Sequence, residues 1–472
     1  MQLLAQTRRV AGAIGLAVLL LPSGALSQSL TDALIAAYRN SNLLEQNRAV
    51  LRAADEDVAQ AVADLRPVVN FIARTRAEVF PGADIGARST SLSASLNLSA
   101  DVTVHDFGRG RLAVEAAQAN VLAVRAGLVE LEQRVLLNAV AAFMEVRSAA
   151  DQVALRESNV RLIEQELNAA RERFEVGEVT RTDVSIAEAR LAGARSELAA
   201  AQGDLTVARE EYRLATGTAP GQLRAPPALP ATASTLDAAQ NLARHNHPAI
   251  QAVQQEVAAA ELNAERAARA RQGTVSAGAS AGVSASRSTL RGLGSGSSLD
   301  GSIGAELSYR RPLYQGGALP SQVRQARARR DASRAELHQT VAEVLQGVAR
   351  AWSNAEVAAA RIEASRLQID AAETSFEGIR EEATLGARTT LDVLNAEQEL
   401  LDARGALVDA QAAQQVAAYA VLEAMGLLTV DHLNLGIPTY DPEAYFNAVR
   451  NAPARSPQGE ALDRVLQSLG RD

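Results

Sequence analysis

The chain has 472 residues, of which 47% are hydrophobic but only 3% aromatic, and alanine makes up much of the hydrophobic share. This composition does not favour a thick globular core and is typical of long helices that pack closely through small side chains. A formal charge of −8, with basic residues spread along the chain, disfavours nucleic acid as a partner. The absence of cysteine excludes disulfides, thiolate metal sites and thiol nucleophiles.

Residues 1–27 are predicted to form a signal peptide. Arg8 and Arg9 precede an apolar run from Ala11 to Leu21, and small residues follow as far as Ser27. A membrane-spanning helix is the alternative, but the run is shorter than the roughly 20 apolar residues that a span requires. No later segment has such a run. A mature chain that enters a membrane must therefore do so through strands.

The remainder of the chain is a tandem duplication. A shift of 209 residues (386 − 177) places Gly177 on Gly386 and continues without a gap until Gly217 lies on Gly426. A similar shift aligns the segments that begin near residues 30 and 236. We therefore divide the chain into a first repeat at 28–218, a Pro-rich linker at 219–234, a second repeat at 235–427 and a C-terminal segment at 428–472.

Each repeat is expected to consist of a helix, two strands, a long helix, a short turn and a further helix. In the first repeat the expected elements are a helix at about 30–65, strands at about 68–80 and 90–104, and helices at about 110–174 and 181–216. In the second repeat the strands are expected at about 273–286 and 301–311, and the helices at about 319–382 and 389–426. The stretches 81–88 and 287–301 are expected to be hairpin loops because they are rich in turn residues.

The predicted strands have one apolar and one polar face. Apolar residues such as Leu92, Leu96 and Leu98 alternate with polar residues such as Ser91 and Asn97 over a longer stretch than in most soluble strands. Such strands suit a transmembrane barrel, but four cannot close one, because even small barrels need about 8. The sequence therefore predicts a barrel shared by several subunits.

The helices that follow the strands carry heptad repeats. Apolar side chains recur every seven residues at Val184, Leu191, Leu198, Leu205 and Tyr212, with alanine between them. The helix that begins near Leu112 and ends near Phe174 would be roughly 95 Å long at about 1.5 Å per residue. These patterns predict long, closely packed coiled coils.

The ordered set of features resembles the outer-membrane efflux proteins of the TolC family. The features are the signal peptide, the duplicated unit, the Val-Gly177 and Leu-Gly386 turns, and the segments Phe107-Gly108-Arg109-Gly110 and Pro312-Leu-Tyr-Gln-Gly-Gly317. The tail from Tyr440 to Pro453 is also similar to the family's C-terminal segment. The resemblance covers nearly all of the mature chain.

The resemblance implies an α+β membrane protein in the outer membrane of a Gram-negative bacterium. It implies a homotrimer in which each subunit contributes four strands to a twelve-stranded barrel and its helices to a periplasmic coiled-coil tunnel. The linker and the tail would form an equatorial belt. The expected partners are outer-membrane lipid, a periplasmic adaptor and an inner-membrane pump of the RND or ABC type. The tunnel would open by untwisting of its periplasmic helices.

The resemblance also implies the residues of a gate. Arg388 occupies the position of an arginine that links to the neighbouring subunit, and Thr182 and Asp183 occupy the positions of its partners. Asp392 matches an aspartate ring that narrows the pore. From the residues alone, helix capping after a glycine turn is the favoured explanation of Asp183 and Asp392.

Other positions depart from the family's pattern. Asn395 replaces the second acidic ring, and Ala383 replaces a tyrosine of the closing network. Gly177 and Gly386 are expected to be helix C-caps and the tips that an adaptor would touch. Glu178 and Ala387 follow them, where the family often has leucine.

The sequence therefore predicts a passive exit duct for efflux or type I secretion. The alternative is a periplasmic coiled-coil adaptor, although adaptors of that type have one helical hairpin and this chain has two. No nucleophile, base and acid are placed together by a motif, so we expect neither an enzyme nor a cofactor. His245 and His247 lack further ligands, and no metal site is expected.

Overall fold

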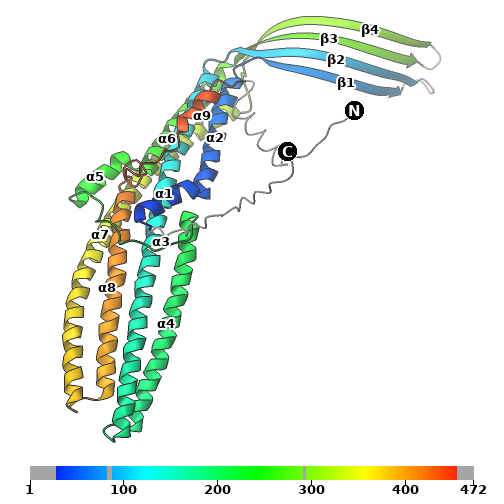
Figure 1. Ribbon diagram of the computed structural model, residues 1–472. Coiled ribbons are helices and arrows are strands. Elements are labelled where there is room, and N and C mark those ends of the chain that lie inside the picture. Colours follow the sequence, from blue (N-terminus) through cyan, green and yellow to red (C-terminus); the bar gives the residue numbers. More distant parts are fainter. Residues whose placement is uncertain (1–27, 82–87, 291–293, 454–472) are drawn as a thin grey trace, which may run out of the picture.

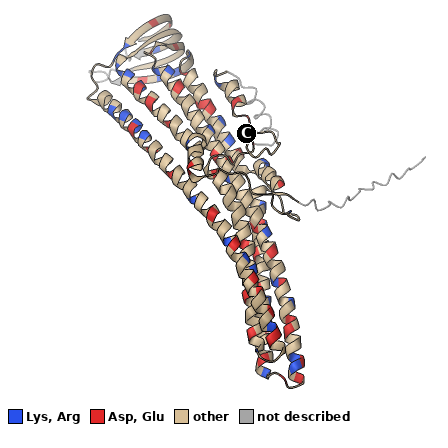
Figure 2. Cartoon of the chain, turned by 90° about the vertical axis from the view of Figure 1, so that its left-hand side faces the viewer, with Lys and Arg blue, Asp and Glu red and all other residues tan. Residues whose placement is uncertain are grey.

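The computed structural model of the chain describes residues 28–81, 88–290 and 294–453. A four-stranded sheet lies at one end, and long helices extend from it to two hairpin tips at the other end (Figure 1). The predicted signal peptide at 1–27 lies outside the described residues. Charged side chains are distributed along the helices, whereas the sheet carries few (Figure 2).

The sheet is antiparallel throughout, with its strands in chain order. The strands are β1 (Val68–Pro81), β2 (Arg88–His105), β3 (Thr274–Leu290) and β4 (Gly294–Arg310). β2 and β3 pair along their length, so the two repeats share one sheet. β1 and β4 are edge strands with no partner in the described part of the chain.

The strands of the second repeat are longer than the sequence predicts. Stretch 287–301 was expected to be a loop, but β3 continues to Leu290 and β4 begins at Gly294. A ladder of backbone hydrogen bonds does not require large side chains, and Ser286 and Ser298 also bring their hydroxyl oxygens within 2.9 Å across the strand pair. The Gly and Ser residues of this stretch therefore wrongly predicted a long loop where the structure has paired strands.

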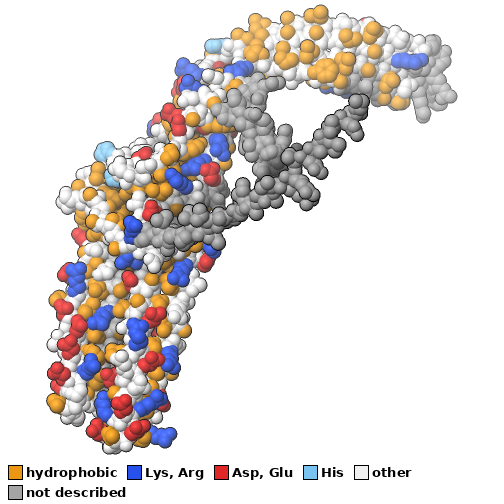
Figure 3. Space-filling model, in the orientation of Figure 1, with side chains coloured by type: hydrophobic (Ala, Val, Ile, Leu, Met, Phe, Trp, Pro, Cys, Tyr) orange, Lys and Arg blue, Asp and Glu red, His pale blue; other side chains and the backbone are white. Residues whose placement is uncertain are grey.

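The two faces of the sheet differ as the alternation predicts. On one face, large apolar side chains are exposed, among them Phe71 at 68% and Ile303 at 93%. Figure 3 shows hydrophobic side chains spread over this end of the molecule. On the other face, Arg74 pairs with Ser95, and Ser95 with Ser284 across the next strand pair. An apolar face of this extent is unusual for a surface in water.

The N-terminal helix of each repeat is broken once. The expected helix at 30–65 is instead α1 (Leu30–Asn40) and α2 (Asn42–Ala63), because the Ser41 hydroxyl caps α2 by accepting a bond from Leu44 N at 3.3 Å. The second repeat breaks at the equivalent position, between α5 (Leu236–Asn246) and α6 (Pro248–Arg269). There His247 Nδ1 accepts a bond from Ala249 N at 3.2 Å. His247 is therefore a helix cap.

Two long helical hairpins follow the strand pairs. The first consists of α3 (Arg109–Glu175) and α4 (Arg181–Thr216), and the second of α7 (Ala318–Thr384) and α8 (Thr390–Ala424). α3 contains a stretch long and apolar enough to span a membrane by length and composition. However, Leu136, Val140 and Phe143 of α3 are fully buried in the main core. Since 33% of that stretch is buried within the chain, its length and composition alone are weak evidence of a membrane span.

The C-terminal segment packs against the first repeat. The short helix α9 (Pro442–Val449) lies beside α2 (Figure 1). Arg125 of α3 donates a hydrogen bond to the carbonyl of Pro442 at 3.3 Å, and its guanidinium lies 5.1 Å from the ring centre of Phe446. The Tyr445 hydroxyl donates to Glu56 Oε1 at 2.7 Å. These contacts hold the tail on the helices next to the sheet.

The helical hairpins are joined to the short helices by the same close contact in both repeats. Gly217 and Gly426 have left-handed φ angles of +73° and +77°. A Cβ on Gly217 would lie 2.7 Å from Asn40 Cβ, and one on Gly426 would lie 2.7 Å from His247 Cα. Only glycine satisfies both the backbone angle and the contact.

We expect Gly426→Ala to destabilise the protein by about 2 kcal/mol or more, because alanine is strained at this φ and its Cβ meets the backbone of the preceding short helix. Thermal unfolding followed by circular dichroism would measure the change. Gly203→Ala is the control, since Gly203 is exposed within α4 and a methyl group added there would meet no atom within 4 Å. It should be neutral or stabilising by about 0.5–1 kcal/mol. Equal effects of the two substitutions would contradict the contact.

A buried carboxyl group of α2 lies close to the C-terminal segment. Asp55 is fully buried, its two oxygens have no hydrogen-bond partner among the described residues, and burial raises its pKa to about 6. Because the folded pKa exceeds the ordinary value of 3.8, the carboxyl favours folding while protonated, and this advantage is lost as pH rises from about 4 to 6.

Asp55→Asn should therefore stabilise the protein at pH 8 by about 1–3 kcal/mol and have little effect at pH 4. Melting temperatures at the two pH values would measure this difference. The exposed neighbour Asp57 provides the control variant Asp57→Asn, which should show no such pH dependence. An equal effect of Asp55→Asn at both pH values would show that the folded state does not disfavour the charged form of Asp55.

Candidate functional site

The two hairpin tips have the same backbone structure. Gly177 and Gly386 have φ angles of +81° and +76°. Glu178 N donates to Arg173 O at 2.9 Å, and Ala387 N donates to the carbonyl of Glu382 at 2.9 Å. Gly177 N also donates to Phe174 O at 3.0 Å, and Gly386 N to Ala383 O at 3.1 Å. Each pair of bonds forms the Schellman motif that ends many helices. Both glycines are therefore helix C-caps.

The tips also expose apolar side chains that the sequence analysis missed. Val176 is 72% exposed and Leu385 is 84% exposed, each immediately before the tip glycine. Glu178 and Ala387, which follow the glycines, are exposed as well. The position of these two residues immediately before a C-cap glycine was the sequence signal that could have identified them, because a side chain there points outward from the end of the hairpin.

Asp183 and Asp392 complete capping boxes at the starts of the helices that follow the tips, where Thr180 and Thr389 are the N-cap residues. Asp183 Oδ2 accepts bonds from the backbone N and the hydroxyl of Thr180 at 2.9 and 2.7 Å. Asp392 Oδ2 accepts the same two bonds from Thr389 at 3.0 and 2.8 Å. These hydrogen bonds lower the pKa of both carboxyls, so both remain charged at neutral pH. Capping is thus one role of each residue.

Arg388 lies at the second tip. Its Nε donates to Glu382 Oε2 at 2.8 Å, and this bond is the main cause of a raised pKa. The described part of one chain contains no contact between Arg388 and Thr182 or Asp183. Arg388 lies in the turn between α7 and α8, whereas Thr182 and Asp183 begin α4 of the other hairpin. The expected link was between subunits.

Polar contacts near the tips join α8 to the first hairpin. Asn395 Oδ1 accepts a bond from Arg190 Nη2 of α4 at 2.7 Å. Two residues further along α8, Glu397 Oε1 accepts a bond from Asn159 Nδ2 of α3 at 2.8 Å. Asn395 was expected at the gate, but its neighbours Arg190, Asn159 and Glu397 were not predicted from the sequence.

Apolar packing supports the same junction. Leu394 of α8 is 3% exposed and packs in a cluster with side chains of α3 and α4. The other buried members of this cluster are Ile163, Leu167, Ala187, Leu191 and Ala194. The start of α8 is therefore docked onto the first hairpin, and moving it away would break apolar and polar contacts together.

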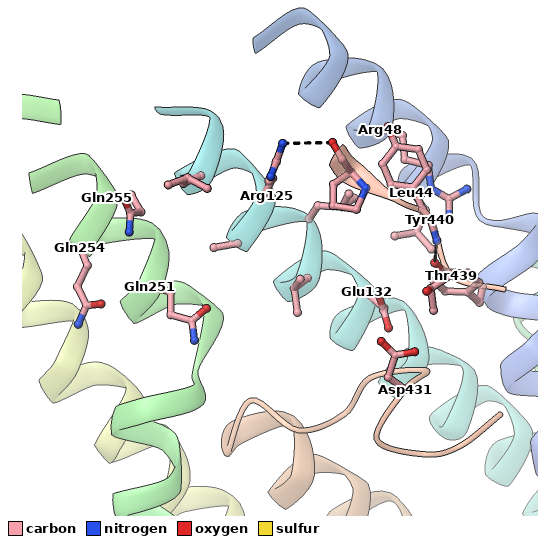
Figure 4. A pocket seen from close by; sticks show the side chains of 16 residues that line it. Leu44, Arg48, Arg125, Glu132, Gln251, Gln254, Gln255, Asp431, Thr439 and Tyr440 are labelled. Carbon is pink, nitrogen blue, oxygen red and sulfur yellow. Dashed lines mark hydrogen bonds between the residues drawn. The ribbon is translucent and has the colours of Figure 1, made fainter. Parts of the chain in front are cut away.

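A cavity of about 470 Å³ lies nearer the sheet, between α2, α3, α6 and the C-terminal segment. Figure 4 shows Gln251, Gln254 and Gln255 of α6 on one side, and the carboxylates of Glu132 and Asp431 close together on another. Burial raises the pKa of Glu132, although its bond from Val430 N, at 2.8 Å, acts in the opposite direction. The charged groups of this cavity hold the C-terminal segment in place.

Within residues 28–81, 88–290 and 294–453, no group of three or more His, Asp or Glu side chains is placed to hold a metal ion.

Comparisons with known proteins agree with this architecture. The family model for outer membrane efflux proteins matches residues 34–218 and 239–427, which is one match for each repeat. The chain is 35% identical to the outer membrane efflux protein BepC of Brucella suis, over 92% of this chain and 94% of that protein. It is 26% identical to the outer membrane protein TolC of Escherichia coli, over 87% and 85% of the two chains.

Among solved structures, CusC, described as forming a transmembrane channel, has a TM-score of 0.70 at 20% identity and covers 85% of this chain and 92% of its own. This likeness concerns the fold, which combines a four-stranded contribution to a barrel with a long helical part. Together with the two matches of the family model, it excludes the adaptor alternative. The chain therefore belongs to the outer membrane efflux protein family and is an outer-membrane exit duct.

Proposed function

We propose that three copies of the chain form a passive duct that crosses the outer membrane and continues through the periplasm. Each copy would give four strands to a twelve-stranded barrel and two hairpins to the tunnel. Residues 1–27 would direct export and be removed. The duct would carry out no reaction of its own, and a partner pump would supply the energy.

The unpaired edges of the sheet are the observation that supports this proposal most strongly. β1 and β4 run antiparallel to each other, since three antiparallel pairings separate them. The β4 edge of one copy can therefore pair with the β1 edge of the next in the same antiparallel pattern. Such pairing satisfies the backbone groups that lipid cannot, while the exposed apolar face contacts the hydrocarbon.

The hairpin tips would form the gate and the docking end of the duct. A ring of Asp392 carboxylates, kept charged by the Thr389 bonds, would attract cations and repel anions. Asn395 adds no second ring of charge, so one acidic ring would set the selectivity. Arg388 would restrain opening by a contact with Thr182 and Asp183 of a neighbouring copy.

An adaptor would bind at the tips. Gly177, Glu178, Gly386 and Ala387 form their outermost turns, and Val176 and Leu385 offer exposed apolar contacts beside them. Docking of the adaptor and its RND or ABC pump would favour untwisting of the hairpins. The pump would determine the cargo, which would leave the cell either by efflux or by type I secretion.

Single-channel conductance in a planar bilayer tests the gate. Arg388→Ala should increase the conductance by removing the restraint. Asp392→Asn keeps a capping side chain but removes the charge, and should weaken block by a divalent cation about tenfold or more.

Two variants away from the tips serve as controls. Arg366→Ala removes an exposed arginine of α7 that pairs with Glu363 of the same helix, and Asp402→Asn removes an exposed charge of α8. Both should behave as the wild type. If folded wild-type protein formed no channel, the duct itself would be contradicted, whereas wild-type behaviour of Arg388→Ala and Asp392→Asn would contradict only the assigned gate residues.

A further inference from the structure

A buried carboxyl group joins the two hairpins close to the tips. Glu397 of α8 is 4% exposed, and Asn159 of α3 is 5% exposed. Asn159 Nδ2 donates to Glu397 Oε1 at 2.8 Å. The other oxygen of Glu397, Oε2, has no hydrogen-bond partner in the described part of the chain. A buried carboxyl with a free oxygen is costly when charged and much less costly when protonated.

Within the described residues, no basic side chain bonds to this carboxyl group. On α3, Glu166 has the same charge, and Arg156 pairs with Glu197 at 2.6 Å. On α4, Arg190 donates to Asn395. On α7, Glu373 holds Arg404 of α8 at 3.0 Å. The charged groups named here are thus either acidic or already bound to another residue, and Glu166 is the charged neighbour that acts on Glu397.

The protonation of Glu397 follows from these surroundings. Burial, and then repulsion from Glu166, raise its pKa to about 7, while the bond from Asn159 acts in the opposite direction. Exposed to water, the same carboxyl would have its ordinary pKa of 4.5. The packed arrangement therefore favours the protonated form. Its advantage is complete below about pH 4.5 and is lost as pH rises to about 7.

We propose that Glu397 and Asn159 form a proton-dependent clasp that holds α8 against α3 and thereby sets the opening of the tips. While the carboxyl is protonated, the hairpins remain packed. When the proton passes to water, the buried charge favours separation of α8 from the first hairpin. The clasp makes Glu397 a positioning residue of the gate and rests on the proposed opening of the tips.

The duplication provides a built-in comparison. Glu188 of α4 occupies the position equivalent to Glu397, 209 residues earlier (397 − 188), but it pairs with Arg171 at 2.7 Å with half of its side chain exposed. Gln368, the equivalent of Asn159, is exposed. The clasp therefore exists in only one of the two repeats, where it joins the two hairpins to each other.

The distance between α3 and α8 tests the clasp directly. The chain has no cysteine, so Ser158→Cys and Glu399→Cys, both at positions beside the clasp, allow two spin labels to be attached. The labelled full chain, diluted with unlabelled protein in lipid, would be measured by pulsed electron paramagnetic resonance from pH 4.5 to 8. In the wild-type background, the ratio of separated to packed hairpins should rise by up to about tenfold per pH unit between pH 4.5 and 7.

Glu397→Gln keeps the shape and the bond to Asn159 but cannot ionise, so its distances should stay short at every pH. Glu188→Gln should retain the wild-type pH profile. A Glu397→Gln profile that follows the wild type, or a wild-type profile that is flat, would overturn the clasp. Because the distances do not depend on conductance, failure of the clasp and failure of the channel are separate results.

Discussion

A sheet cannot present open edges to lipid, and the remainder of this structure depends on that constraint. Each unpaired backbone group in hydrocarbon costs several kcal/mol, because no water replaces the missing partner. The sheet has two such edges, β1 and β4, together with an apolar face that is exposed in a single chain. A chain with these features needs other chains to complete its fold. The same need explains why the core of one chain is thin: much of the burial must come from assembly.

The duplication fits this requirement. Both repeats keep the elements that define the architecture, including the Schellman turns at Gly177 and Gly386 and the close contacts at Gly217 and Gly426. They differ where the hairpins meet, since Glu188 is exposed and ion-paired whereas Glu397 is buried. Repeated elements thus supply the scaffold, and the differences between the repeats provide a place where one hairpin can move relative to the other.

Much of the fold was predictable because it follows from local rules. The alternation around Leu92 and Leu96 indicated two-faced strands, and the tip glycines indicated hairpins. The break at Ser41 was missed because a serine inside an apolar pattern resembles an ordinary helical residue until its hydroxyl is seen to cap the next turn. The length of β3 and β4 was also missed, since Gly and Ser favour turns locally but pair readily within a long ladder.

The site was less predictable. A capping role for Asp183 and Asp392 followed from their position after a glycine turn, but a cap and a pore ring use the same residue at the same place. The burial of Glu397 could not be read from one helix, because it depends on Asn159, more than two hundred residues away in sequence. A periodic pattern predicts which face of a helix is buried, but it does not predict which side chains of a distant helix pack against that face.

Pairing of β4 with β1 of another copy is the central claim, and cysteine cross-linking tests it most directly. Val69→Cys, Ala73→Cys and Ala77→Cys on β1 would each be combined with Ile303→Cys on β4, in a chain that otherwise has no cysteine. Oxidation in membranes should give, for at least one pair, covalent species that end at three subunits on a denaturing gel. Monomers from every pair, or a ladder that continues beyond three subunits, would contradict a closed barrel of three chains.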